Sequence, residues 1–419
     1  MVFIESFKRI LGSDKNGSAS TVAQTAETPS QPPVIQLEFN LHPQLKKLSH
    51  LKQSVWWDSL GRGQINDGSL ARLVAQGVTG VTSNPVIFEQ AIVNHPEIYD
   101  ADMAQLVKSR GATPMNIYET LAIKDVQDAA DLLRPVYDQT GGLDGYVSFE
   151  VSPDLAHRTR VTIEEAHRLA ASIQRPNLMI KIPATRAGLD AIRVLTADGL
   201  NINVTLIFDR SMLQLVADAY MTGLEKRANQ GKSIDSVSSV ASFFISRIDT
   251  AVDTVLNNMI KDPSNDRSVI AGLMGQVAIA NAKLAWQDYQ QMITSPRWKA
   301  LAAIGAKPQR LLWASTGTKN PDYSDLHYVE TLVGGNTVNT MPPATLAALL
   351  DHGNLSGETL TQGAKDAEII MDSLDKLGID FNIIAAKLNQ DGIRIFVEAS
   401  ERLFMAISRK QTTLAKAKN

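Results

Sequence analysis

A lysine lies inside an apolar segment of the chain, LMIKIPA at residues 178–184. If this segment is a strand, Lys181 shares a face with Met179 and lies opposite Ile180 and Ile182, because alternate residues of a strand face opposite sides. Burial disfavours the ammonium form of a lysine and leaves a free amine that can attack a carbonyl carbon. From this residue alone, a lysine that extends to water from a strand end is an equally good interpretation.

Polar residues on other expected strands favour the chemical interpretation. Strand alternation and strand-end position direct six of them toward the lysine: Asp58, Asn84, Glu150, Asn203, Thr205 and Ser242. Such a convergence is hard to explain by packing, and carboxylates among these groups can transfer protons to and from a substrate. Taken singly, a turn before Pro85 is the better interpretation of Asn84, and filling space between Val240 and Phe244 is the better one for Ser242.

Motifs for other chemistries are incomplete. The seven histidines show neither HxH nor HExxH spacing, and the chain has no cysteine, so zinc and iron sites are not expected. Residues 231–233 (GKS) resemble the end of a P-loop, but Lys226 stands where that motif requires glycine. Residues 61–63 (GRG) lack the third glycine of a dinucleotide-binding loop, which is replaced by Asn66. The sequence therefore predicts no cofactor.

The elements that must position these residues alternate along the chain. Short strand-like runs are separated by longer helical segments, which is typical of βαβ units with a parallel sheet. The eight runs are 55–58, 80–84, 145–151, 177–182, 200–207, 236–245, 310–315 and 337–341. Four of them end at or close to a proline, and proline favours extended geometry in the residue before it.

The two faces of these runs differ in polarity. In the fifth run, Ile202, Val204 and Leu206 oppose Asn203 and Thr205. A sheet covered by helices on both faces is apolar on both, so a polar second face favours a closed barrel with a hydrated interior and a site at the C-terminal strand ends. We therefore expect an α/β fold, a TIM (β/α)8 barrel with additional helices. Long helical insertions are expected at about 85–143 and 247–309.

Two of the expected helices carry terminal signals. Thr162 and Glu165 match a capping box and precede apolar residues at helical spacing up to Ile173. A second helical pattern runs from Leu213, and Gly231 is its expected stop.

Composition narrows the class of protein further. A net charge of −3 and a pI near 6.2 give no electrostatic signature of nucleic-acid binding, and no apolar run reaches the roughly 18 residues of a membrane helix. The absence of cysteine fits a reducing cytoplasm. We expect residues 1–40 to form a flexible N-terminal extension, with a short amphipathic face at 3–11, and residues 41–419 to form the barrel with its C-terminal helices.

Several long segments of the chain resemble the transaldolase family in its longer bacterial branch. They are WWDSLGRGQI (56–65), GVTSNPVIFEQAI (80–92), VSFEVSP (147–153), MIKIPAT (179–185), NINVTLIF (201–208), VASFFISRID (240–249) and ASTGTKNP (314–321). The resemblance covers nearly everything from residue 45 onward. It implies transfer of a dihydroxyacetone unit from a ketose phosphate to an aldose phosphate in the non-oxidative pentose phosphate pathway. Some relatives continue into a phosphoglucose isomerase, and we expect that second activity to be absent here.

The resemblance also implies roles for particular residues. Lys181 would form the Schiff base, Asp58 would act as acid and base at the C4 hydroxyl, and Glu150 with Thr205 would hold a catalytic water. Substrate contacts are implied for Thr82, Asn84, Asn203, Ser242, Phe244, Arg247 and Ser315, of which Arg247 and Ser315 hold the phosphate. Shorter transaldolases have an arginine just after the position of Ser315, whereas this chain has Lys319 nearby.

Two other functions are open. A Schiff-base aldolase that releases free dihydroxyacetone is similar in the lysine strand, but such relatives tend to have tyrosine at the position of Phe244. A catalytically silent barrel that serves as a scaffold is disfavoured by the intact polar set. The sequence defines neither the acceptor sugar nor the oligomeric state.

Overall fold

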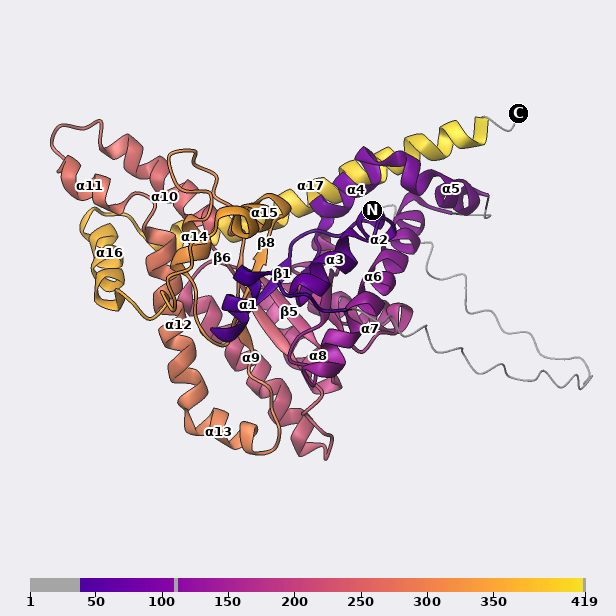
Figure 1. Ribbon diagram of the computed structural model, residues 1–419, viewed down its shortest axis with the longest axis horizontal. Coiled ribbons are helices and arrows are strands. Elements are labelled where there is room, and N and C mark those ends of the chain that lie inside the picture. The colour runs from indigo at the N-terminus through magenta and orange to yellow at the C-terminus, as the bar shows by residue number, and fades with distance from the viewer. Residues whose placement is uncertain (1–37, 109–111, 417–419) are drawn as a thin grey trace, which may run out of the picture. The chain divides into compact units, whose positions relative to one another are not determined.

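The eight expected strands form one closed parallel barrel in chain order, in a computed structural model that describes residues 38–108 and 112–416 (Figure 1). The strands are β1 Gln53–Trp57, β2 Gly80–Thr82, β3 Tyr146–Glu150, β4 Leu178–Pro183, β5 Ile202–Ile207, β6 Ser239–Phe244, β7 Arg310–Ala314 and β8 Thr337–Met341. Pairing of β1 with β8 closes the sheet. The TIM-barrel expectation is confirmed. Residues 1–37, most of the expected N-terminal extension, lie outside the described residues.

The strand register places three of the expected site residues at the same height in the barrel. Glu150 of β3 pairs with Lys181 of β4, and Lys181 pairs with Asn203 of β5. Residues at one level of neighbouring strands share a face, so the three side chains enter the barrel side by side. The positions of strands alone therefore assemble the centre of the site.

The alternation expected for the fifth run is interrupted at Leu206. This residue has a φ of 59°, and the pairing of β5 with β6 shifts between Val204 and Ile207. A β-bulge redirects a side chain and increases the local twist. Leu206 accordingly lies against Gly392, where an added Cβ would approach the Leu206 side chain to 2.7 Å. The expectation that Leu206 continues the face of Val204 was wrong for this reason.

Helices surround the barrel and extend over its C-terminal end. Before β6 they are α1 Pro43–His50, α2 Arg62–Asn66, α3 Ser69–Gln76, α4 Pro85–Asn94, α5 Pro96–Val107, α6 Pro114–Gln139, the 3₁₀ helix η2 Pro153–Leu155, α7 Thr159–Ile173, α8 Arg186–Asp198 and α9 Arg210–Asn229. After β6 they are α10 Ser246–Met259, α11 Arg267–Leu273, α12 Val277–Thr294, α13 Pro296–Ala303, α14 His327–Thr331, α15 Pro343–His352, α16 Ala364–Lys376 and α17 Phe381–Lys416. Both long helical insertions are confirmed.

The two helix signals had different outcomes. Helix α9 ends at Asn229, and Gly231 follows with a φ of 70°, as expected of a glycine stop. Helix α7 begins at Thr159, so Thr162 lies inside it and caps nothing. The Thr162 hydroxyl donates instead to the carbonyl of Leu155 at 3.0 Å, and the capping-box interpretation was wrong.

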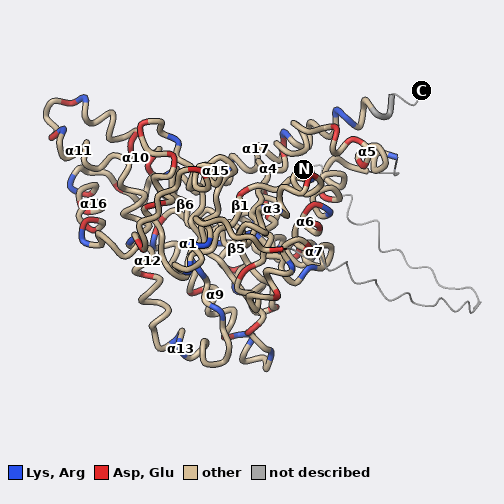
Figure 2. The backbone as a smooth tube through the Cα atoms, in the orientation of Figure 1, with Lys and Arg blue, Asp and Glu red and all other residues tan. Residues whose placement is uncertain are grey.

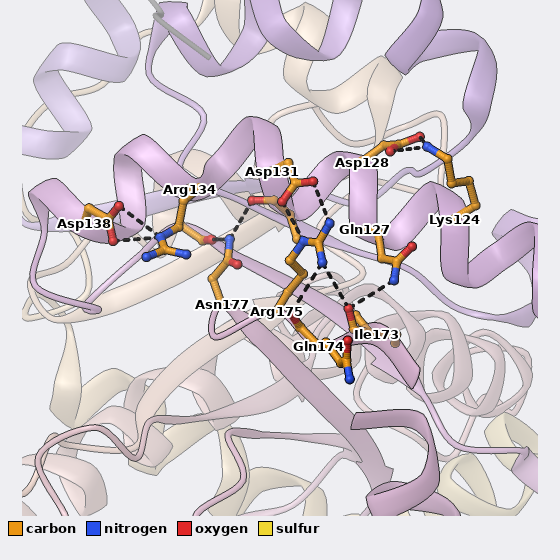
Figure 3. Close-up of polar contacts among 12 residues, drawn as sticks. Lys124, Gln127, Asp128, Asp131, Arg134, Asp138, Ile173, Gln174, Arg175 and Asn177 are labelled. Atoms are coloured by element: carbon orange, nitrogen blue, oxygen red, sulfur yellow. Dashed lines mark hydrogen bonds and ion pairs between the residues drawn. The ribbon is translucent and has the colours of Figure 1, made fainter. Parts of the chain in front are cut away.

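The turn before β4 is fastened to α6 by side chains (Figure 3). Arg175 donates to both carboxylate oxygens of Asp131, at 2.6 and 2.8 Å. The buried Asn177 amide donates to the carbonyls of Ala130 and Gly145, at 2.8 and 2.7 Å. These contacts fix the start of the strand that bears the lysine, since buried polar groups are stable only when hydrogen-bonded.

A glycine allows α6 to approach β3. Gly145 has a φ of +83°, and an added Cβ would lie 2.3 Å from the backbone nitrogen of Tyr137. Only glycine combines this conformation with this approach.

The C-terminal helix α17 runs alongside α4 and also contacts α5, α6, α10 and β5 (Figure 1). The Asn389 amide of α17 donates to the carbonyl of Leu206 at 2.9 Å, which links this helix to the bulge of β5. Helix α17 is therefore attached directly to the C-terminal ends of the strands.

Charged residues of both signs are interspersed along the helices (Figure 2). Within residues 38–108 and 112–416, no single helix has the length and apolar character of a membrane span. Helices α11 and α12 reach that threshold only when they are combined across a bend of 57°.

Candidate active site

A pocket opens at the C-terminal ends of the strands. Ten of the twelve residues expected in the site line it: Asp58, Thr82, Asn84, Lys181, Thr205, Ser242, Phe244, Arg247, Ser315 and Lys319. The other two, Glu150 and Asn203, lie directly behind this lining, in contact with Lys181 and Ser242. The structure therefore brings all twelve together.

Lys181 is the most enclosed cation of the pocket. The residue is 5% exposed, and its amine donates to the carbonyl of Ser83 at 3.0 Å. A carboxylate oxygen of Glu150 lies 3.6 Å from the amine. The side chain thus stays inside the barrel rather than extending to water, which removes the alternative interpretation of this lysine.

Two carboxylates flank the amine in different surroundings. Burial raises the pKa of Asp58, although the Lys181 charge and a hydrogen bond from Thr82 act in the opposite direction. The Thr82 hydroxyl donates to Asp58 at 2.6 Å and lies 2.6 Å from the Thr340 hydroxyl. Burial also raises the pKa of Glu150 to about 7. Glu150 can therefore take and return a proton near neutral pH.

The Glu150 and Thr205 side chains have unused hydrogen-bonding capacity. Both carboxylate oxygens of Glu150 and the hydroxyl oxygen of Thr205 are buried, and none of the three has a hydrogen-bond partner among the described residues. Buried polar atoms usually have a partner, and one that lacks it marks a place for an ordered water or a ligand. Glu150 and Thr205 could therefore both hydrogen-bond to one water molecule, as expected from the sequence.

A chain of hydrogen bonds fixes the polar floor. Ser242 donates to the side-chain oxygen of Asn203 at 2.7 Å, and the Asn203 amide donates to the Ser148 hydroxyl at 3.0 Å. Asn84 performs the turn function considered above, since its oxygen accepts from the backbone of Ile87 and caps α4. It lines the pocket as well, so the structural and chemical interpretations of Asn84 are compatible.

Two cations lie on the side of the pocket formed by β6 and β7. The Arg247 guanidinium is 5.5 Å from the ring of Phe244, and burial lowers its pKa. Ser315 has a φ of 57°, and its hydroxyl lies 2.9 Å from that of Ser246. Lys319 is exposed at the rim. Cations and hydroxyls are the groups that bind anions in proteins.

Sequence reasoning missed several residues of the pocket. The buried ring of Phe396, on α17, lies 5.9 Å from the Lys181 amine, while Gln90 and Thr340 add polar atoms to the wall. The apolar periodicity of 381–416 indicates a helix, but periodicity contains no information about which distant strand ends that helix covers. Among the described residues, no group of three metal-binding side chains was found.

The structure is a (β/α)8 barrel with a buried lysine, two carboxylates and two further cations at one pocket. A family model for transaldolase/fructose-6-phosphate aldolase matches residues 55–407. The chain belongs to this family.

Curated relatives named transaldolase align with this chain over nearly their whole length. "Transaldolase 2" of Nostoc sp. (strain PCC 7120 / SAG 25.82 / UTEX 2576) is 46% identical over 377 residues, which cover 88% of this chain and 98% of that protein. "Transaldolase" of Thiobacillus denitrificans is 45% identical, with coverage of 86% and 99%. "Transaldolase 2" of Streptomyces coelicolor is 44% identical, with coverage of 89% and 99%.

Proposed function

We propose that this protein is a transaldolase that transfers a dihydroxyacetone unit from fructose 6-phosphate or sedoheptulose 7-phosphate to an aldose phosphate. The observation that carries this function is the enclosure of the Lys181 amine beside Glu150, at the floor of a pocket with cations at its rim. A desolvated amine is a nucleophile toward a ketone, and a cationic rim matches a phosphate ester.

The proposed reaction begins at the ketose C2 carbonyl. Lys181 attacks this carbon, and loss of water then gives an iminium. Glu150 and a water molecule held with Thr205 transfer the protons that this dehydration requires. Asp58 then takes the C4 hydroxyl proton, the C3–C4 bond breaks, and the aldose phosphate leaves. The iminium accepts the electron pair, so this reaction requires no metal. A second aldose phosphate reverses these steps on the remaining enamine.

The other side chains bind the substrate in this proposal. Asn84, Asn203 and Ser242 contact the sugar hydroxyls, and Thr82 orients Asp58 through the hydrogen bond of 2.6 Å. Arg247, Ser315 and Lys319 bind the phosphate.

Release of free dihydroxyacetone is the competing function, and Phe244 argues against it. This ring is 6% exposed and lies 5.1 Å from the ring of Phe208, with a tilt of 41°. A phenylalanine has no hydroxyl with which to protonate the enamine, so the intermediate persists until an acceptor arrives. Release of dihydroxyacetone without an acceptor, at a rate equal to transfer, would favour the aldolase.

The experiment is borohydride reduction in the presence of fructose 6-phosphate, followed by mass mapping of the protein. We expect a covalent three-carbon or sugar-phosphate adduct on Lys181 and none in Lys181→Ala. Trapping of a different lysine, or no adduct in the wild-type protein, would overturn the proposed function.

A further inference from the structure

Two cations of the pocket depend on the backbone for their positions. Neither the Arg247 guanidinium nor the Lys319 amine makes a hydrogen bond or an ion pair with another described residue, although both line the pocket. Arg247 is the second residue of α10, and Lys319 lies in the segment 315–326 between β7 and α14. The separation of the two charges is thus determined by how this segment is held against α10.

Two tyrosine hydroxyls hold the segment and α14 to that helix. Tyr323 donates to a carboxylate oxygen of Asp253 at 2.8 Å. Tyr328 donates to a carboxylate oxygen of Asp249 at 2.9 Å. Both aspartates are on α10, one helical turn apart, and both are buried, at 7% and 1% exposure. Hydrogen bonds between buried polar groups are costly to break, because a group left without a partner is not solvated by water either.

The second oxygen of each aspartate is used on the other side. The backbone of Ala278 donates to Asp249 at 2.8 Å, and the backbone of Gly275 donates to Asp253 at 3.1 Å. Each carboxylate is therefore held from both directions and cannot turn without losing a partner. Gly275 also leaves room for a tyrosine, since an added Cβ there would lie 2.7 Å from the Tyr323 ring.

A histidine fills the space between the tyrosines. The ring centroid of His327 is 5.3 Å from that of Tyr323 and 4.9 Å from that of Tyr328. His327 Nε2 is 2.8 Å from the carbonyl oxygen of Gly275. We call Tyr323, Tyr328, Asp249 and Asp253 the tyrosine clamp.

We propose that the tyrosine clamp positions Lys319 relative to Arg247 and so preforms the phosphate site. The inference rests on the proposed function for the identity of the phosphate, which belongs to the sugar substrate. A rigid pair of cations binds an anion more tightly than a mobile pair, because the ordering cost is met during folding. The tyrosines are positioning residues, since their hydroxyls bond to α10 rather than to the substrate.

The test is the double variant Tyr323→Phe/Tyr328→Phe. Loss of both hydroxyls should raise KM for fructose 6-phosphate about three- to fivefold, and weaken competitive inhibition by inorganic phosphate by a similar factor, with kcat changed less than about twofold. Borohydride trapping of unphosphorylated dihydroxyacetone on Lys181 should be unchanged. Tyr220→Phe is the matched control, because its hydroxyl donates to the carbonyls of Val237 and Lys307, before β6 and β7 at the opposite barrel end.

A conservative substitution separates positioning from bulk stability. Asp253→Asn keeps an oxygen for the Gly275 backbone and an amide that can donate to the Tyr323 oxygen, whereas Asp253→Ala keeps neither. We expect near-wild-type inhibition by phosphate in the asparagine variant and weakened inhibition in the alanine variant.

Two results have distinct meanings. Wild-type inhibition by phosphate in the double tyrosine variant, with only a lower thermal midpoint, would overturn the clamp. Failure of the wild-type protein to trap an adduct on Lys181 would overturn the proposed function, while binding of phosphate measured by calorimetry would still decide the clamp.

Discussion

The Lys181 amine and the Glu150 carboxylate lie 3.6 Å apart on adjacent strands, and both residues are more than nine-tenths buried. At this separation the Glu150 carboxylate can accept a proton during formation of the iminium and return it later. A protonated Glu150 cannot accept that proton, so the ionised carboxylate is the competent form in the proposed reaction.

The pH profile of kcat/KM should therefore fall below neutrality. Burial raises the pKa of Glu150 to about 7, so this carboxyl group becomes protonated as the pH decreases through this value. We expect log kcat/KM with fructose 6-phosphate to decrease with decreasing pH below about 7, and Glu150→Gln to lose this limb together with at least about a hundredfold of activity. An identical acid limb in Glu150→Gln would assign the titration to another group.

Substitution of Asp58 should block cleavage of the C3–C4 bond without blocking formation of the Schiff base on Lys181. Asp58→Ala retains the amine but lacks the base for C3–C4 cleavage, for which a positioned group supplies roughly 10²- to 10⁴-fold. We expect turnover to fall at least about a hundredfold while borohydride still traps a fructose 6-phosphate adduct. Near-normal turnover of this variant, measured with a coupled assay, would exclude the assigned role.

The two cations that we propose to bind the phosphate, Arg247 and Lys319, should differ in their contribution to substrate binding. Arg247 is partly buried, whereas Lys319 is exposed at the rim, and exposed ion pairs contribute about 0–1 kcal/mol. We expect Arg247→Ala to raise KM for fructose 6-phosphate about ten- to a hundredfold and Lys319→Ala less than about fivefold. Equal effects in steady-state kinetics would contradict this ranking, and unphosphorylated fructose serves as the control substrate.

Gly145→Ala should destabilise the barrel strongly. The new Cβ would meet the Tyr137 backbone at 2.3 Å, so either α6 or β3 must shift. Gly231→Ala is the control, because Gly231 also has a positive φ but has no heavy atom within 4 Å of an added Cβ. We expect about 1–2 kcal/mol of lost stability for Gly231→Ala and more than about 4 for Gly145→Ala, measured by urea unfolding. Similar losses would show that backbone conformation alone sets the requirement for glycine.

The barrel could be predicted because each strand contains its own signal. Alternation along β3 and β5 identifies the face of Glu150, Asn203 and Thr205, and closure of the sheet brings that face inward. The alternation ends at Leu206, where contact with α17 and a bulge outweigh the local pattern. A local pattern cannot indicate such an irregularity, because its cause lies almost 200 residues later in the chain, roughly the separation of Leu206 from Gly392.

The residues of the site that local sequence patterns missed are likewise those placed by contacts between distant parts of the chain. Lys181 and Asp58 lie at or near the ends of strand segments that can be recognised in the sequence. Phe396 instead reaches the pocket through a helix whose position depends on tertiary contacts. The Thr162 motif has the correct spacing for a cap, but the helix begins three residues earlier, at Thr159. Local capping preferences contribute only about 1 kcal/mol, and packing of the whole helix can outweigh them.

The attachment of α17 to the strand ends has a consequence for synthesis of the chain. Asn389 and Phe396 follow every strand in sequence, so a growing chain presents all eight strands to folding before it can cover Lys181. A nascent barrel still attached to the ribosome would expose its amine to cellular aldehydes and ketones without the ring of Phe396 above it. Shielding of Lys181 is therefore one of the last steps of folding, because it requires a helix that follows all eight strands in the chain.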